Sequence, residues 1–234
     1  MTNGKVDRSY VDQTVNGLKE QFTSIGTQGG PNMLRNSRAD EGLKYWNSNG
    51  KMNFTAHEFY FNGQKKMFQL DKGAIVTSPR FIIKRNTNYM LNMTGFDAGS
   101  KSFKILLCKR VKGSARDYDE KQEILYAKGN PIFDSSRAVK KSLKFNTGNY
   151  DEGFLQFEYE DPNVSWWAGL FMTELDLYEG ENDRKWQPAP EDQNYLIDQA
   201  QATFTKTVNG LSTQLSNLCL LYTSPSPRDR QKSR

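Results

Sequence analysis

The sequence has few of the side chains on which most catalytic and metal sites depend. Its 234 residues include a single histidine, His57, and two cysteines. One histidine excludes a histidine-based metal cluster within one chain, and a Ser-His-Asp triad would have to use His57. In a strand that also holds Phe59 and Phe61, a lone histidine is more often structural or in contact with a ligand than a catalytic base. We therefore expect no enzymatic activity.

Long apolar runs are absent as well. No stretch approaches the about 18 apolar residues of a membrane span, and residues 1–5 lead into no hydrophobic signal core. We expect no membrane partner and no secretion signal. The glycine-rich segment at 26–31 lacks the Gly-Lys-Ser/Thr ending of a phosphate loop, so we assign it no nucleotide.

The last segment, residues 219–234, is treated separately. It resembles a conceptual translation of a sequencing adapter, and we predict that it is disordered and exclude it from fold reasoning. The alternative is a basic Ser/Pro tail that binds nucleic acid. The segment holds four Lys/Arg and one Asp, so its removal lowers the formal charge from +5 to +2. Cys108 then stands alone, which excludes an internal disulfide.

The corrected charge does not favour a nucleic-acid partner for the rest of the chain. A basic run at 137–144 has no interleaved aromatic residues. We interpret it as the solvated face of a strand. Its cationic members are Arg137, Lys140, Lys141 and Lys144.

A short motif occurs near both ends of the chain. TVNGL at 14–18 recurs at 207–211, and the surrounding apolar residues are spaced 4-3-4-3 in both copies, which is an a/d heptad seam. The pattern predicts helical, coiled-coil-like linkers at 1–27 and 193–218 that join copies of the chain. We expect a homotrimer, although Val and Leu at these positions do not fix the number of chains. The alternative is an amphipathic helix folded back on its own domain. The seam residues are Val11, Val15, Leu18, Phe22 and Ile25, then Phe204, Val208, Leu211, Leu215 and Leu218.

Between these linkers, residues 28–192 show short alternating apolar runs separated by turn residues. Period-two alternation is clean at 88–94 and 102–109. Eight or more antiparallel strands in about 150 residues predict a jelly-roll β-sandwich, so the fold class is mainly β. The predicted strands lie at 33–36, 52–61, 67–70, 81–84, 88–94, 102–109, 123–127, 139–145, 153–160 and 168–178.

Some details of strand arrangement can also be predicted. The segment at 95–99 is typical of a hairpin connection, which would make the strands at 88–94 and 102–109 antiparallel neighbours. We expect Trp46 to anchor the core. The residues expected to face inward together in the last strand are Phe171, Leu175 and Leu177.

Several segments resemble a galactose-binding-like carbohydrate-binding module, in the version found in minor structural proteins of tailed phages and prophages of Gram-positive bacteria. The heptad flanks resemble the linkers of those tail proteins. The resemblance implies a non-enzymatic module of a tail fibre or baseplate protein. Its partners would be host cell-surface glycan, bound during adsorption, and other tail subunits, and its location would be the virion. The segments are NMLRNS at 32–37 with Trp46, FIIK at 81–84 with Tyr89, Leu175 with YEG at 178–180, and WQPAPED at 186–192.

Sugar binding needs flat aromatic surfaces and planar hydrogen-bonding groups. Trp166 and Trp167 follow the turn at 161–163. Because adjacent strand residues point to opposite faces, we expect one to pack inward and the other to be available outside, the alternative being that both lie in the core. The other candidates are Tyr150, Tyr60, His57 and Arg80, with Tyr118, in a polar loop, as a weaker one.

The resemblance also implies a structural calcium that joins the first loop to the last strand. Asp40, Glu41 and Asp176 are the nearest oxygen ligands. Two alternatives to glycan binding stay open. A polysaccharide depolymerase could use a carboxylate pair such as Glu174/Asp176 or Asp40/Glu41. The chain could instead be a purely structural spacer or oligomerisation unit of the tail.

Overall fold

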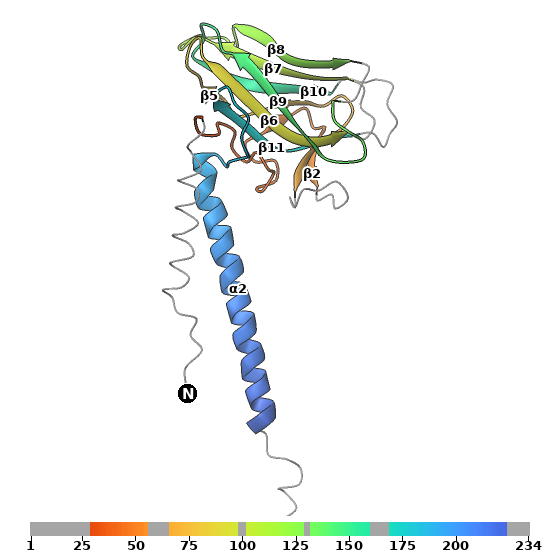
Figure 1. Ribbon diagram of the computed structural model, residues 1–234, viewed down its shortest axis with the longest axis vertical. Helices are drawn as coiled ribbons and strands as arrows, with labels where there is room; N and C mark the ends of the chain where they lie inside the picture. The colour runs from red at the N-terminus through yellow and green to blue at the C-terminus, as the bar shows by residue number, and fades with distance from the viewer. Residues whose placement is uncertain (1–28, 56–65, 98–101, 129–131, 160–168, 224–234) are drawn as a thin grey trace, which may run out of the picture. The chain divides into compact units, whose positions relative to one another are not determined.

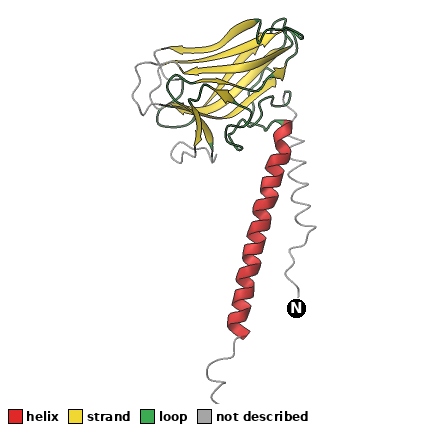
Figure 2. Cartoon of the chain, turned by 180° about the vertical axis from the view of Figure 1, so that it is seen from behind, coloured by secondary structure: helices red, strands yellow, loops and turns green. Residues whose placement is uncertain are grey.

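Two antiparallel sheets packed face to face form a β-sandwich (Figures 1 and 2). The computed structural model describes residues 29–55, 66–97, 102–128, 132–159 and 169–223. The six-stranded sheet contains β1 (Asn47–Ser48), β4 (Ile75–Thr77), β10 (Glu152–Tyr159), β7 (Ser102–Arg110) and β8 (Glu120–Lys128) in that order, with β5 (Phe81–Ile82) paired to β10. The five-stranded sheet has the order β2 (Met52–Thr55), β3 (Met67–Leu70), β11 (Leu170–Glu179), β6 (Asn88–Asp97) and β9 (Val139–Asn146). The predicted mainly β sandwich is confirmed.

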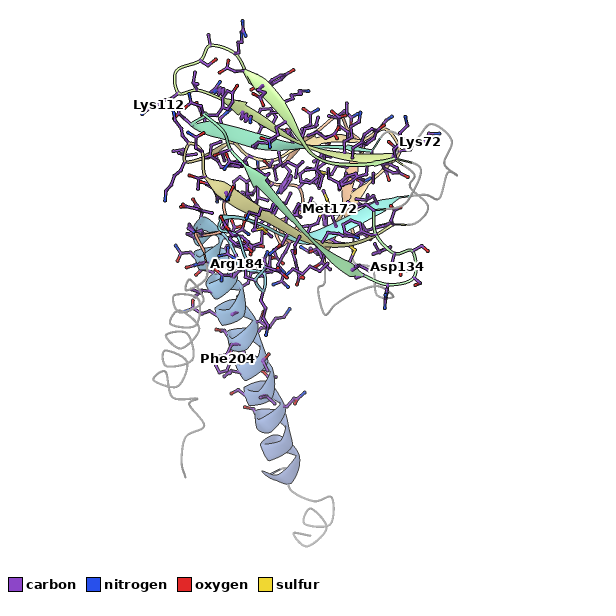
Figure 3. All side chains as sticks on the ribbon, turned by 45° about the horizontal axis from the view of Figure 1, so that its top comes forward. Lys72, Lys112, Asp134, Met172, Arg184 and Phe204 are labelled. Carbon is purple, nitrogen blue, oxygen red and sulfur yellow. The ribbon has the colours of Figure 1, made fainter. Side chains whose placement is uncertain are left out.

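The core lies between the two sheets and is formed by the inward-facing residues of both (Figure 3). Trp46 is 6% exposed, and its ring centroid lies 5.0 Å from that of Phe68 and 6.0 Å from that of Phe157. These two rings come from different sheets, so Trp46 ties the layers together and is confirmed as a core anchor. The most buried inward residues of β7 and β10 are Ile105, Leu107, Leu155, Phe157 and Tyr159.

The predicted hairpin between β6 and β7 was wrong. β6 lies between β11 and β9, whereas β7 lies between β10 and β8 in the other sheet. Alternation shows only that a strand has one face toward the core. Two strands that face each other across the core alternate as cleanly as two neighbours do, so the pattern could not distinguish the two arrangements.

A β-bulge changes which residues of β11 face the core. The register with β6 shifts between Thr173 and Asp176, and Glu174 has a positive φ of 54°. Because the bulge inserts one residue, the alternation changes phase. Phe171, predicted to face inward with Leu175 and Leu177, instead stacks on Phe96 outside the main core, with centroids 4.4 Å apart. The β11 residues in the main core are Leu170, Met172, Leu175 and Leu177.

One further strand prediction differs from the structure, two short strands were not predicted, and one prediction lies partly outside the described residues. The segment at 33–36 forms no strand; Asn36 has a φ of 50°, and its side-chain amide donates to the carbonyls of Gly42 and Lys44. An asparagine that bonds nearby backbone competes with a sheet ladder in this way. β1 and β4 were not predicted, because two or three residues are too few to show alternation. The strand at 52–61 is described only as β2, since 56–65 lie outside the described residues.

Two terminal segments lie along β11. The Gly30 and Met33 amides donate to the carbonyls of Glu179 and Leu177, each at 2.8 Å. Asn32 contributes its whole side chain, because its amide donates to the Leu175 and Gln187 carbonyls and its oxygen accepts from two backbone amides. The NMLRNS and WQPAPED segments therefore contact each other beside β11.

Helix α2 (Pro190–Thr223) follows the sandwich. A proline at its first position costs no hydrogen bond, and Glu191 and Asp192 in its first turn suit the positive end of the helix dipole. α2 covers the whole predicted linker at 193–218 and continues through 219–223, where we had expected disorder; 224–234 and the predicted linker at 1–27 lie outside the described residues. No described helix is both long and apolar enough to cross a bilayer. Contacts within the chain group Ser24–Asp192 as one compact unit, separate from the flanking segments.

Candidate functional site

The outer face of the six-stranded sheet carries two exposed tyrosines. Residues directly opposite each other in neighbouring strands share a face. The pairings Phe154↔Cys108, Cys108↔Lys121 and Lys104↔Tyr126 therefore place these side chains together on the side away from the core. We call this surface the tyrosine face; it consists of Lys104, Tyr118, Lys121, Tyr126, Phe154, Gln156 and Glu158, with Arg80 at one end.

Lysine ammonium groups hold both tyrosine rings. Tyr118 and Tyr126 are 39% and 38% exposed. The Lys121 Nζ lies 4.8 Å from the centroid of the Tyr118 ring, and the Lys104 Nζ lies 4.8 Å from that of Tyr126. Such cation–π contacts limit ring motion and leave each ring partly open to solvent.

Polar groups line the sheet between the tyrosines. The Gln156 Oε1 accepts from the Lys121 Nζ at 3.4 Å, and the Gln156 amide donates to Glu158. The Glu158 carboxylate also lies 3.8 Å from the Lys104 Nζ. An amide, a carboxylate and two ammonium groups thus lie together on the tyrosine face.

A hollow of about 270 Å³ adjoins this surface at Arg80. The Arg80 guanidinium lies 5.1 Å from the Phe154 ring centroid and donates to the Asp117 carboxylate at 2.6 Å. Its Nη1 is buried and makes no hydrogen bond with any described residue. The lining residues are Asn47, Thr77, Ser78, Pro79, Arg80, Asp117 and Phe154.

Cys108, below the tyrosine face, is not a nucleophile in this setting. Its side chain is buried, and its thiol contacts the Gln156 Oε1 at 3.7 Å. Burial raises the pKa of the Cys108 thiol to about 11. The thiolate needed for covalent chemistry is therefore scarce at neutral pH.

The predicted sugar-binding residues fall in different places. Arg80 lies at the tyrosine face. Tyr150 does not, because its hydroxyl donates to Glu120 at 2.8 Å and its ring lies beneath the buried Lys109, which alternates with Cys108 and faces inward. The hydrogen bond from Tyr150 lowers the pKa of the Glu120 carboxyl. Trp166, Trp167, Tyr60 and His57 lie outside the described residues.

Sequence reasoning missed Tyr126 and ranked Tyr118 low. Tyr126 could have been found from its place in a predicted strand, but its outward direction could not. β8 shifts register against β7 between Ile105 and Leu106. Counting alternate residues along β8 therefore gives the wrong face beyond that point.

The three predicted calcium ligands do not form a metal site. The Asp176 carboxylate is fully buried and pairs with the Arg184 Nε and Nη2, each at 2.8 Å. Glu41 accepts from Lys44. In the described ranges no group of three Asp, Glu, His or Cys side chains could hold a metal ion. Arg184 supplies the positive charge beside Asp176, which is too enclosed to act with Glu174 as a hydrolytic pair.

The sequence matches no protein-family model and no curated protein. Solved structures similar to it include carbohydrate-binding modules. The CBM22-1 xylan-binding domain of Paenibacillus barcinonensis Xyn10C is 15% identical over 67% of this chain and 98% of its own, with a TM-score of 0.45. TmCBM61, in complex with β-1,4-galactotriose, is 10% identical over 63% of this chain and 98% of its own, with a TM-score of 0.39.

A tailspike is also similar. The enzymatically active domain of bacteriophage CBA120 tailspike protein 4 is 10% identical to this chain over 63% of its length, with a TM-score of 0.44. The match spans only 21% of the tailspike structure.

Proposed function

We propose that this chain is a non-enzymatic carbohydrate-binding module that binds glycan along the tyrosine face. The observation that carries the proposal is the pair of exposed rings, Tyr118 and Tyr126, with hydrogen-bonding groups between them. Aromatic rings pack against the C–H faces of sugars, while amide, carboxylate and ammonium groups match sugar hydroxyls.

The hollow at Arg80 would bind one end of the glycan and so fix its direction along the tyrosine face. The buried Nη1 carries N–H donors that no described residue accepts, and a buried donor without a partner is costly. A sugar hydroxyl in the hollow would accept from Nη1. Because Asp117 fixes the other side of the guanidinium, the donor is held in place before the ligand arrives.

We further propose that the module belongs to a phage or prophage tail protein on the virion, and that its ligand is a glycan of the host cell surface. The support is the resemblance of the segments at 32–37 and 186–192 and of the heptad flanks to those of tail proteins. Other tail subunits and further copies of the chain would be its partners.

The binding proposal is tested by retention on Gram-positive cell walls and on a glycan array. We expect the chain to be retained, and Tyr118→Ala with Tyr126→Ala to weaken retention about tenfold or more, which corresponds to about 1.4 kcal/mol. Phe54→Ala is the matched control, because Phe54 is an exposed aromatic residue on the other sheet.

Three results would contradict the proposal. Retention that survives the double tyrosine change would place the ligand elsewhere. No retention on any wall or array would favour the structural spacer. Release of reducing ends from wall glycan would indicate the depolymerase instead.

A further inference from the structure

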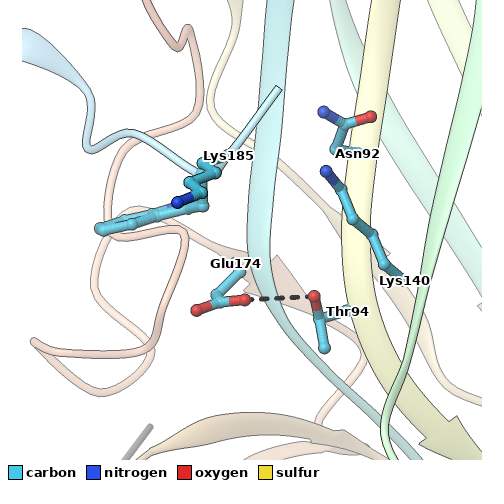
Figure 4. Close-up of a pocket in the computed structure, with 6 residues that line it drawn as sticks. Asn92, Thr94, Lys140, Glu174 and Lys185 are labelled. Carbon is cyan, nitrogen blue, oxygen red and sulfur yellow. Dashed lines mark hydrogen bonds between the residues drawn. The ribbon is translucent and has the colours of Figure 1, made fainter. Parts of the chain in front are cut away.

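A second hollow lies on the outer side of the five-stranded sheet (Figure 4). Its volume is about 390 Å³. Strands β6, β9 and β11 form its floor and one side, and the segment after β11 forms the other. It belongs to the opposite sheet from the tyrosine face. The lining residues are Asn92, Thr94, Lys140, Glu174, Lys185 and Trp186.

The Asn92 side chain contributes to this hollow a buried oxygen that accepts no hydrogen bond from the described residues. The side chain is 1% exposed, and its Nδ2 donates to the Tyr178 hydroxyl and the Arg184 carbonyl. The orientation of the amide is fixed, because the Tyr178 hydroxyl uses its own hydrogen on the Asn182 carbonyl and must accept from Asn92. The Asn92 Oδ1 therefore remains an acceptor, and no described residue donates to it.

Glu174 adds a second acceptor. It sits in the β-bulge with its φ of 54°, and its Oε2 accepts from the Thr94 hydroxyl at 3.1 Å (Figure 4). Its other oxygen accepts nothing from the described residues. Bulges often redirect a side chain, and a residue held at positive φ indicates a position fixed by its surroundings. Without the bulge, the alternation of β11 would place this carboxylate on another face.

The rim of the hollow is cationic. Lys185 is exposed and forms no ion pair with any described residue, whereas Lys140 is paired with Asp183. Trp186 is held firmly, since its Nε1 donates to the Ser37 Oγ at 3.1 Å and the Arg38 guanidinium lies 4.3 Å from its ring centroid. A ligand would therefore meet two acceptors, one unpaired ammonium group and a fixed aromatic ring.

We propose that this hollow binds one sugar unit that carries an anionic substituent, either carboxylate or phosphate. Ring hydroxyls donate to the Asn92 Oδ1 and to Glu174, and the anionic group binds the Lys185 ammonium. The volume lies in the lower part of the range of about 300–1,000 Å³ typical of ligand pockets, which suits a single ring. A free cationic ligand is disfavoured, because Lys140 and Lys185 both line the site.

Calorimetric titration of the full chain with matched sugars tests this proposal. The probes are glucose, glucuronate and glucose 6-phosphate, which differ only at C6, together with galactose and galacturonate. The titrations are done with Tyr118→Ala and Tyr126→Ala in place, so that binding at the tyrosine face does not contribute. We expect at least one acidic sugar to bind tenfold or more tightly than its neutral counterpart, and its binding to shift the NMR signals of the Asn92 side-chain amide.

Two lysine variants then localise the anion. Lys185→Met should remove the preference for the acidic sugar. Lys141→Met should keep it, because Lys141 is also exposed but is one residue from Lys140 along β9 and alternates to the other side. A response to glucuronate or galacturonate alone identifies a carboxylate ligand, and a response to glucose 6-phosphate alone identifies a phosphate ligand.

Several results would overturn the proposal. They are equal binding of neutral and acidic sugars, no binding of any probe at millimolar concentration, and inorganic phosphate binding as tightly as glucose 6-phosphate. Loss of the preference in Lys141→Met would also overturn it.

Discussion

Arg184 and Asp176 are opposite charges placed in the interior. Burial raises the pKa of the Asp176 carboxyl above its usual range, even though two hydrogen bonds from Arg184 favour its charged form. The guanidinium also stacks on the Tyr178 ring at 3.6 Å and donates to the Gly30 carbonyl at 2.6 Å. The Arg184 side chain thus joins the segment that follows β11 to β11 itself and to the segment that precedes the first strand.

Loss of Arg184 alone should be severe, because it leaves a buried carboxylate without its partner. We expect Arg184→Met to lower the free energy of unfolding by about 3–5 kcal/mol, and Arg184→Met with Asp176→Leu to recover much of that loss. Urea unfolding measures both. Lys84→Met, which breaks the exposed pair with Glu179, is the control and should change little. A single Arg184 variant as stable as this control would refute the argument.

At the same scale, the sequence could nominate site residues only by type. Arg80 was named as a candidate because its side chain can hydrogen-bond a sugar, and it does reach the tyrosine face. Tyr150 was an equally reasonable candidate, but Glu120 and Lys109 occupy its hydroxyl and ring. Neither partner is near Tyr150 in the sequence, so only the folded chain shows that it is occupied. Asn92 was not considered, because its unmatched oxygen follows from the two hydrogen bonds that its nitrogen makes to Tyr178 and Arg184, both far along the chain.

Among the secondary-structure elements, the long strands could be predicted from the sequence, but which strands pair with each other in a sheet could not. β6, β7, β9 and β10 each contain a run of alternating residues, and the predictions fall within three residues of their bounds. Sheet assignment depends on contacts across the core that have no local pattern. The bulge in β11 could not be predicted from the sequence either, since a glutamate at position 174 does not mark that position as bulged.

The bulge can be tested through the backbone of Glu174. A β-branched residue is strained at positive φ, so we expect Glu174→Val to lower the free energy of unfolding by about 1–2 kcal/mol. Glu174→Gly should be tolerated, because glycine adopts this conformation freely. Thermal unfolding measures the difference. Ser142→Val, in strand β9 of the same sheet, is the matched control and should cost much less, because Ser142 does not have a positive φ. Equal losses of stability from valine at 174 and at 142 would show that the positive φ at position 174 is not required for folding.

For the molecule as a whole, α2 determines whether copies associate. Phe204 and Val208 are half-buried, and Leu211 is 55% exposed. These positions follow the heptad seam, and we propose that α2 joins copies of the chain as a homotrimer. Two heptads are short, so the association should depend on concentration.

Sedimentation of the full chain at several concentrations tests the seam. We expect a trimer at high concentration, and Val208→Asp with Leu211→Asp should give monomers because buried carboxylates are costly. Lys206→Asp with Thr213→Asp adds similar charges away from the seam and should leave the trimer intact. A chain that stays monomeric throughout would make α2 a simple tether.

The hydrogen bonds between the segments at 30–37 and 186–192, which we call the clamp, have a mechanical consequence. The chain reaches the sandwich at Gly30 and leaves it at Asp192. The segments that contain these two points are joined by hydrogen bonds, because the Asn32 side-chain amide donates to the Gln187 carbonyl at 2.8 Å and the Asn36 backbone amide donates to the Asp192 carboxylate at 2.5 Å. Tension applied through the flanks would pass across this short clamp and would not travel through strands β1 to β10. A ligand held on either outer face would stay bound to an unstretched sheet while the flanks were pulled.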